Sequence, residues 1–297
     1  MDRPVLPLLA LAAILGIAPA AAPAPSLDGR IFLDSDILGV HVQRNPSAGS
    51  GPLSDSESHS IPASGDISAS FEADYGLLRA QSHMQILQTG TLTTQSIDGG
   101  TTASAGWHDT LTISSPGLAG TQGTFLPVFT VHGSLSGSAA GSDPPFSSFS
   151  DVSTIASFLS SVIGVGRNQQ RAITCHADAG DSICAMSGDS YGTWRLAPVP
   201  FEFGAPFTID VTADAGVFLR TVQDGATEGT ADFGSTVAWS GLAGVRDASA
   251  APVASFTVSS SSGFNYAPEP GNLSLGAAAW GALSRLRTRR ARARIEG

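Results

Sequence analysis

The pattern with the clearest catalytic chemistry is Gly188-Asp189-Ser190-Tyr191-Gly192, which matches the G-x-S-x-G arrangement of many serine hydrolases. A nucleophilic serine of this kind stands between a strand and a helix and needs a neighbouring base to take its proton. The residues that follow, Thr193-Trp194-Arg195-Leu196 and then Pro198 and Pro200, are instead typical of a turn into another strand. A chain rich in serine and glycine also contains this pattern by chance, so we expect no catalytic role for Ser190.

Two other arrangements could support acid–base chemistry. His108 stands beside Asp109, but adjacent residues of a strand point to opposite faces, so we expect His108 to be an exposed residue at a strand end. Carboxylate pairs of the kind that glycosidases use are also present. They are Asp34 with Asp36, Asp178 with Asp181, and Asp210 with Asp214. Each pair is more simply explained as solvated acids of turns and strand edges, and the sequence therefore predicts no catalytic residue.

The two cysteines of the chain, Cys175 and Cys184, bracket a polar segment that contains Gly180. In an oxidising compartment this arrangement predicts a disulfide across a loop or hairpin. A metal site built from the two thiols and His176 has too few ligands at standard spacing. Calcium at Asp34 and Asp36, or in the loop between the cysteines, stays open, although neither segment matches a known calcium loop. We predict no metal site and no cofactor.

Three tryptophans, Trp107, Trp194 and Trp239, could stack against sugar rings if one face of the protein exposes them together. We expect at least two of them to be packed in the core instead.

The elements that must position these side chains are strands. Apolar and polar residues alternate with a period of two over 66–75, 110–114, 125–136, 207–211 and 256–258. Clusters of Gly, Pro, Asp and Ser separate these runs. This pattern predicts an all-β fold, an antiparallel β-sandwich or jelly roll.

Two segments depart from the alternation. In residues 151–164, Ile155, Leu159, Val162 and Ile163 have helical spacing, Asp151 could cap the start and Gly164 could end the segment, so we expect one short inserted helix. Residues 45–66 read as a mobile loop.

The charge of the body is strongly acidic. The chain has no lysine, and between residues 23 and 283 there are 8 arginines and 23 acidic residues, a net charge near −15. Such a surface repels nucleic acid and anionic lipid, so nucleic acid is excluded as a partner.

Both ends of the chain have the pattern of targeting signals. The apolar run Val5 to Ile17, followed by small residues, predicts a helical secretion signal over 1–22. At the other end, Pro268-Glu269-Pro270 precedes an apolar run from Leu273 to Leu283, which we expect to be helical. The arginines of a membrane-stop signal follow at Arg285, Arg287, Arg289, Arg290, Arg292 and Arg294. A bilayer span needs about 20 apolar residues, so whether this shorter run works as an anchor stays open.

With this C-terminal layout, the chain resembles the PEP-CTERM proteins, exported bacterial proteins named for a Pro-Glu-Pro sorting motif. Stretches of the body resemble a recurrent ectodomain of the same proteins, namely 73–78, 109–112, 117–118, 231–236, 255–258 and 263–266. The resemblance implies three parts: a signal peptide (1–22), a β-sandwich ectodomain (23–266) and a sorting signal (267–297). It also implies that an exosortase-like enzyme cuts near Pro268, Glu269 and Pro270 while the tail holds the chain in the inner membrane of a Gram-negative bacterium.

Our first functional hypothesis is therefore an exported, non-catalytic protein of the cell surface or extracellular matrix that an exosortase-type system processes. The alternative is a carbohydrate-binding, lectin-like module in the exopolysaccharide. A secreted hydrolase that uses Ser190 is the third. The expected partners are the processing enzyme, the inner membrane transiently and, for the alternative, exopolysaccharide.

Overall fold

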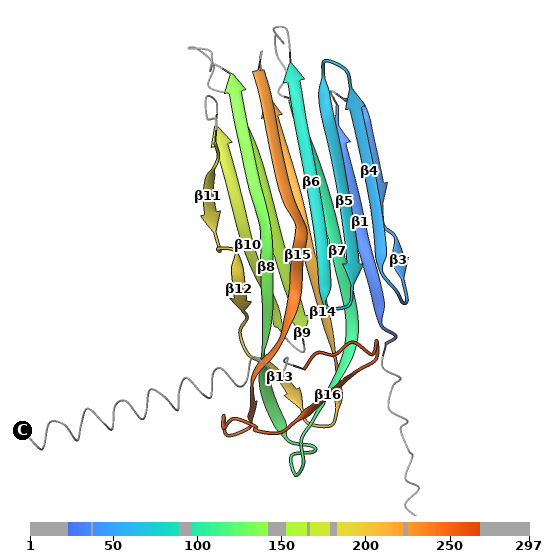
Figure 1. The fold of residues 1–297 in the computed structure, drawn as a ribbon, viewed down its shortest axis with the longest axis vertical. Coiled ribbons are helices and arrows are strands. Elements are labelled where there is room, and N and C mark those ends of the chain that lie inside the picture. Colours follow the sequence, from blue (N-terminus) through green and yellow to red (C-terminus); the bar gives the residue numbers. More distant parts are fainter. Residues whose placement is uncertain are drawn as a thin grey trace, which may run out of the picture.

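The computed structural model describes residues 23–36, 38–88, 97–141, 153–164, 167–178, 183–221 and 225–267. These residues form two antiparallel sheets that pack face to face along one long axis (Figure 1). The predicted antiparallel β-sandwich is thus confirmed. Across the described ranges there is no helix, and hence none long and apolar enough to cross a bilayer. The predicted signal helix and C-terminal apolar helix lie outside these ranges.

The strands are β1 Ser26–Ser35, β2 Val40–Arg44, β3 Ser47–Ala48, β4 Leu53–Ile61, β5 Gly65–Asp74, β6 Leu77–Gln88, β7 Ile97–Ser114, β8 Gln122–Gly141, β9 Ser153–Gly164, β10 Arg167–Asp178, β11 Ala185–Gly188, β12 Gly192–Arg195, β13 Val199–Glu202, β14 Pro206–Thr221, β15 Gly225–Asp247 and β16 Thr257–Ser260. The nine-stranded sheet has the order β11-β10-β9-β14-β7-β1-β2, with β16 on β7 and β3 on β1. The seven-stranded sheet has the order β12-β8-β15-β6-β5-β4, with β13 on β8.

The core lies between the two sheets and is built from the alternation in the sequence. In β5, for example, Ile67, Ala69 and Phe71 are buried, while Ser68 and Ser70 alternate with them and are half-buried on the outer face. Phe71 reaches across to β1, where a Cβ on Gly29 would lie 2.0 Å from its ring, so only glycine fits there. Trp107 of β7 meets Phe129 of β8 with ring centroids 6.4 Å apart. Burial of each such side chain stabilises the sandwich by about 1.5–3 kcal/mol.

The predicted inserted helix over 151–164 is wrong, because Ser153–Gly164 forms strand β9 between β10 and β14. Ile155, Leu159 and Ile163 are spaced by four residues. A spacing of four fits one face of a helix, but it is also a multiple of the strand period of two. Isoleucine and valine, which are β-branched, favour the strand, and two neighbouring strands supply the backbone hydrogen bonds.

The interpretation of residues 45–66 as a loop is also wrong, since the segment contains β3 and β4. β4 is an edge strand whose outward positions are serines and whose inward positions include Asp55, Glu57 and His59, so the alternation lacks most of its apolar half there. On the inward side of β4 the acids form salt bridges with β2. Arg44 of β2 lies 3.3 Å from Asp55 and also pairs with Glu57. These pairs link the edges of the two sheets.

Candidate functional site

The predicted disulfide is confirmed. Cys175 on β10 and Cys184, just before β11, are bonded with their Cα atoms 5.4 Å apart. The bond closes the β10–β11 hairpin, in which Cys175 lies opposite Met186. Cys175 is fully buried, but every residue of β11 is exposed. His176 contacts Asp178 at 2.8 Å. The bond therefore fixes a hairpin at the rim of the nine-stranded sheet.

Ser190, the candidate nucleophile, lies exposed in the turn between β11 and β12. A strand follows it, where a nucleophile elbow has a helix. Its carbonyl accepts a hydrogen bond of 2.7 Å from Trp194 Nε1, and the preceding Asp189 pairs with Arg171 at 3.0 Å. The turn thus has a structural explanation for its polar residues, and the geometry offers no elbow for Ser190.

Of the candidate acid pairs, Asp210 and Asp214 are kept apart by the strand that carries them, whereas Asp34 and Asp36 flank the ring of one histidine. Asp210 and Asp214 lie four residues apart on β14, roughly 13 Å by strand rise, whereas glycosidase pairs lie about 5–10 Å apart. Asp34 contacts His41 Nδ1 at 2.6 Å, and Asp36 is 3.7 Å from Nε2 of the same ring. Asp181 lies outside the described residues. Among the side chains that the structure describes, no three His, Cys, Asp or Glu come together as a metal site.

The outer face of the nine-stranded sheet carries acids on β1 and β14, on either side of β7. His108 is half-buried in mid-strand on this face, not at a strand end as we predicted, and its Nδ1 pairs with Asp210. Asp28 lies above Gly106. Partial burial, followed by repulsion from Asp210, raises the pKa of Asp28. Burial also raises the pKa of Asp214, although the hydroxyl of Ser104 opposes the shift.

The three tryptophans do not form an exposed platform. Trp107, Trp194 and Trp239 expose 1%, 3% and 9% of their surface, so all three belong to the core. The expectation that at least two are packed inside is confirmed, and stacking of a sugar on this set is excluded.

Asp109, which the sequence presented only as the neighbour of His108, is fully buried on the core side of β7. It lies in the row Ala105, Trp107, Asp109, Leu111, Ile113, so a charge occupies a position that the pattern reserves for apolar residues. A buried carboxylate requires hydrogen-bond donors, because its desolvation is otherwise unfavourable by several kcal/mol. The prediction that His108 and Asp109 face opposite sides is confirmed.

Three of the four donors come from residues 257–266, which we call the strap. Ser261 Oγ donates to Asp109 at 2.7 Å and the Ser262 N–H donates at 3.1 Å. The Ser262 hydroxyl donates to the other carboxylate oxygen, and the Thr110 N–H adds a bond of 2.8 Å. The carboxylate thus binds a segment about 150 residues further along the chain.

An aromatic cluster seats the end of the strap. Tyr266 is fully buried, with Trp239 edge-on to its ring at 5.1 Å and Phe264 at 4.7 Å. Phe264 covers Gly76, which has φ of +78° and no room for a Cβ. Trp239 Nε1 donates to the Tyr266 carbonyl at 3.3 Å. Burial, followed by the charge of Asp109, raises the pKa of Tyr266 far above that of a free tyrosine.

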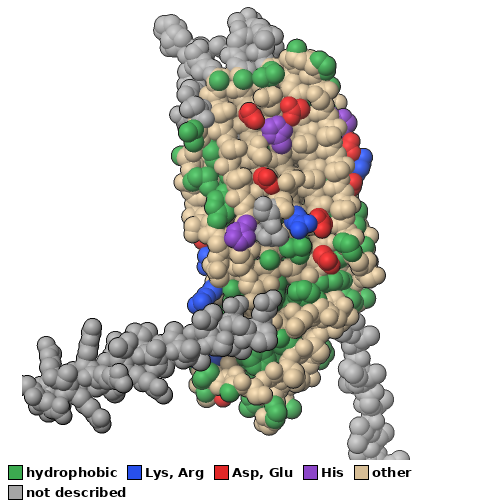
Figure 2. All heavy atoms as spheres, viewed as in Figure 1, with side chains coloured by type: hydrophobic (Ala, Val, Ile, Leu, Met, Phe, Trp, Pro, Cys, Tyr) green, Lys and Arg blue, Asp and Glu red, His purple; other side chains and the backbone are tan. Residues whose placement is uncertain are grey.

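The outer face of the seven-stranded sheet carries a different polar surface. The area of short side chains on this face consists of Ser54, Ser56 and Ser58 on β4 with Ser68 and Ser70 on β5. We call this surface the serine shelf. In Figure 2, which shows this face, most of the surface is neutral, and basic and histidine side chains stand next to acidic ones.

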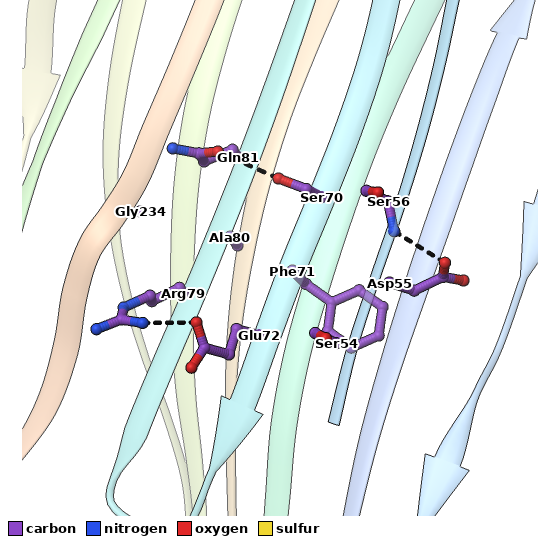
Figure 3. A pocket seen from close by; sticks show the side chains of 10 residues that line it. All are labelled: Ser54, Asp55, Ser56, Ser70, Phe71, Glu72, Arg79, Ala80, Gln81 and Gly234. Atoms are coloured by element: carbon purple, nitrogen blue, oxygen red, sulfur yellow. Dashed lines mark hydrogen bonds and ion pairs between the residues drawn. The ribbon is translucent and has the colours of Figure 1, made fainter. Parts of the chain in front are cut away.

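Longer side chains of β6 bound the shelf on one side. Figure 3 shows Arg79 pointing to Glu72, and Gln81 pointing to Ser70. Gln81 Nε2 also donates to Asp232 of β15 at 2.8 Å. A Cβ on Gly234 would lie 2.2 Å from the same nitrogen, so the glycine makes room for this bond. The hollow beside Arg79 and Gln81 measures about 560 Å³.

Sequence reasoning missed both the strap and the shelf. The signal for the strap was a charged residue on the apolar face of a strand. The signal for the shelf was the run Leu53-Ser-Asp-Ser-Glu-Ser-His-Ser, in which serine occupies every second position. The sorting residues Pro268, Glu269 and Pro270 and the arginines Arg285, Arg287, Arg289 and Arg290 lie outside the described residues.

No protein-family description and no curated protein matches this chain. A solved structure described as a carbohydrate-binding module of the β-sandwich superfamily is 10% identical to it. The similarity covers 71% of this chain and 84% of that one, with a TM-score of 0.12. A likeness of this size carries no argument, so the interpretation depends on the geometry of the chain itself.

Proposed function

We propose that the protein is an exported, non-catalytic component of the cell surface or extracellular matrix, and that an exosortase-type enzyme processes its C-terminal segment at Pro268, Glu269 and Pro270. The observation that carries the proposal is the Cys175–Cys184 disulfide. Structural disulfides persist in oxidising compartments and are rare in the cytosol. The absence of lysine and the acidic body suit a soluble protein outside the cell.

The strap supports the same proposal by its position. Tyr266 is buried, and Pro268 follows it by two residues. A tail that begins at residue 267 therefore leaves the sandwich from a fixed point. Removal of the tail beyond this point leaves Asp109, Ser261 and Tyr266 in the released body, so the fold keeps its closure after the cut.

The test is a substitution of the motif in the native cells. The variant Pro268→Ala/Glu269→Ala/Pro270→Ala should accumulate uncut in the membrane fraction, whereas the unaltered protein reaches the surface or the medium. Glu202→Gln, which changes an exposed acid of β13, is the matched control and should behave like the unaltered protein. If the triple variant is cut and released like the control, the sorting proposal is wrong.

A further inference from the structure

We infer that the serine shelf binds an uncharged, polyhydroxylated chain, of which a neutral polysaccharide is the simplest case. The inference deepens the proposed function by naming a ligand class. It rests on that function only for the place where such a polymer is met, because the contact itself involves β4, β5 and β6 and not the tail.

The hydroxyls of the shelf are available to a ligand. In the described part of the chain, the side chains of Ser54, Ser56, Ser58 and Ser68 have no hydrogen-bond partner from the protein. Each hydroxyl both donates and accepts, which matches the hydroxyls of a sugar. Along β4 the three serines recur about every 6.6 Å, so the shelf offers the same contact repeatedly to an extended chain.

The charges beside the shelf exclude an acidic polymer. Arg79 is 2.5 Å from Glu72, and His83 is 2.9 Å from Asp66, so both basic groups already have carboxylate partners. Asp232 adds a further acid at the rim. A polyanion therefore meets carboxylates without a free arginine to bind it.

The longer side chains beside the shelf are held by hydrogen bonds to one another. Gln81 accepts from Ser70 at 3.1 Å and donates to Asp232, and His83 Nδ1 contacts Thr230 at 2.9 Å. These bonds tie β5, β6 and β15 together across the outer face. Side chains held in place before binding lose little conformational freedom on binding, which favours association.

The affinity is expected to be low for a short ligand. Phe71 lines the hollow beside the shelf, but it is a core residue that exposes only 4% of its surface, so stacking of a sugar on it does not contribute. A few hydrogen bonds alone correspond to dissociation constants in the range of about 1 mM. A long polymer that presents many copies of the same contact raises the apparent affinity by multivalency.

The experiment is affinity electrophoresis of the oxidised, full-length chain in native gels that contain dextran, hydroxyethyl cellulose or alginate. The two neutral polymers should retard the protein and the acidic alginate should not. In the variant Ser56→Gln/Ser58→Gln, longer side chains fill the shelf without a change of charge. Because these side chains occupy the space that the polymer would fill and separate it from the neighbouring serines, the affinity for the retarding polymer should fall by about tenfold. The matched control is Ser134→Gln/Ser136→Gln on the exposed face of β8 in the same sheet, which should stay within about twofold.

Circular dichroism and thermal unfolding check that both variants are folded. Retardation by a neutral polymer that the shelf variant loses and the control keeps supports the inference. Retardation by neither neutral polymer, equal loss in both variants, or retardation by alginate alone would overturn it. Each result is independent of the sorting motif, because the full-length chain keeps its tail in the assay. Loss of binding would therefore leave the sorting proposal standing, and failure of the sorting test would leave the binding inference standing.

Discussion

Two segments of the chain are fastened to the sandwich by different kinds of contact: the β10–β11 hairpin by a disulfide, and the strap by hydrogen bonds and aromatic packing. At the β10–β11 hairpin, a covalent bond joins residues nine positions apart, next to a strand that is fully exposed. At the strap, a buried carboxylate and an aromatic cluster join residues about 150 positions apart, near the end of the sandwich where β16 pairs with the last residues of β7 (Figure 1). The comparison shows that the covalent bond is used where little core is available. The strap is held without one because Trp239, Phe264 and Tyr266 bury enough surface around Asp109.

Removal of the buried carboxylate should have the largest effect on stability. In Asp109→Ala, the hydroxyls of Ser261 and Ser262 lose their acceptor inside the protein, and the free energy of unfolding should fall by roughly 3 kcal/mol or more. Urea denaturation measures the change. The control Asp34→Ala removes an exposed acid and should lower stability by less than about 0.5 kcal/mol. Equal effects in the two variants would show that the strap does not depend on Asp109.

The disulfide should contribute less to the free energy of unfolding than Asp109 does. In the double variant Cys175→Ser/Cys184→Ser, the hairpin loses its cross-link, and stability should fall by about 2–3 kcal/mol according to the entropy of a short closed loop. Reduction of the unaltered protein should lower the urea midpoint to a similar degree. If the double variant is less stable than Asp109→Ala, the order of the two closures is the reverse of our account.

Two glycine variants distinguish the stability lost when the strap is displaced from the stability lost through backbone strain alone. Gly76→Ala places a Cβ about where the Phe264 ring lies, 2.1 Å from its Cζ, at φ of +78°. Gly117→Ala has nearly the same φ of +79° but open space around the Cβ. Both variants lose about 1 kcal/mol through strain, and Gly76→Ala should lose a further 1–2 kcal/mol or so through displacement of the ring. Limited proteolysis within residues 257–266 should be faster in Gly76→Ala alone.

The smallest expected effect concerns Asp28, whose pKa is raised by partial burial and by repulsion from Asp210, while His108 opposes the shift. Because its pKa is raised in the folded state, folding favours the protonated acid, and stability falls as the pH rises from the ordinary carboxyl pKa of about 4 through the raised value. Asp28→Asn should therefore be more stable at pH 7, by about 0.5 kcal/mol or less at this solvent-exposed position. Its advantage should disappear below about pH 4. A constant difference at all pH values would contradict this explanation.

Some of these contacts could be predicted from the sequence, and others could not. Cys175 and Cys184 predict a disulfide by residue type alone. The alternation at Ile67, Ala69 and Phe71 predicts a strand from local sequence. Asp109 is different, because its partners Ser261 and Ser262 lie about 150 residues away and serine occurs throughout the chain. The segment around Leu159 was misassigned because spacing by four residues fits both periodicities. Where the apolar spacing fits both periodicities, the partner strands decide the element, as β10 and β14 do for β9.

The measurement that tests the central proposal most directly is intact-mass spectrometry of the protein recovered from its native cells and medium, with and without reductant. Our account predicts a chain that starts near residue 23 and ends near Pro268 to Gly271, with the strap retained. It also predicts a mass increase of about two daltons on reduction of the single disulfide. A released protein that still ends at Gly297 would contradict processing at the sorting motif, and an unchanged mass on reduction would contradict the closed hairpin.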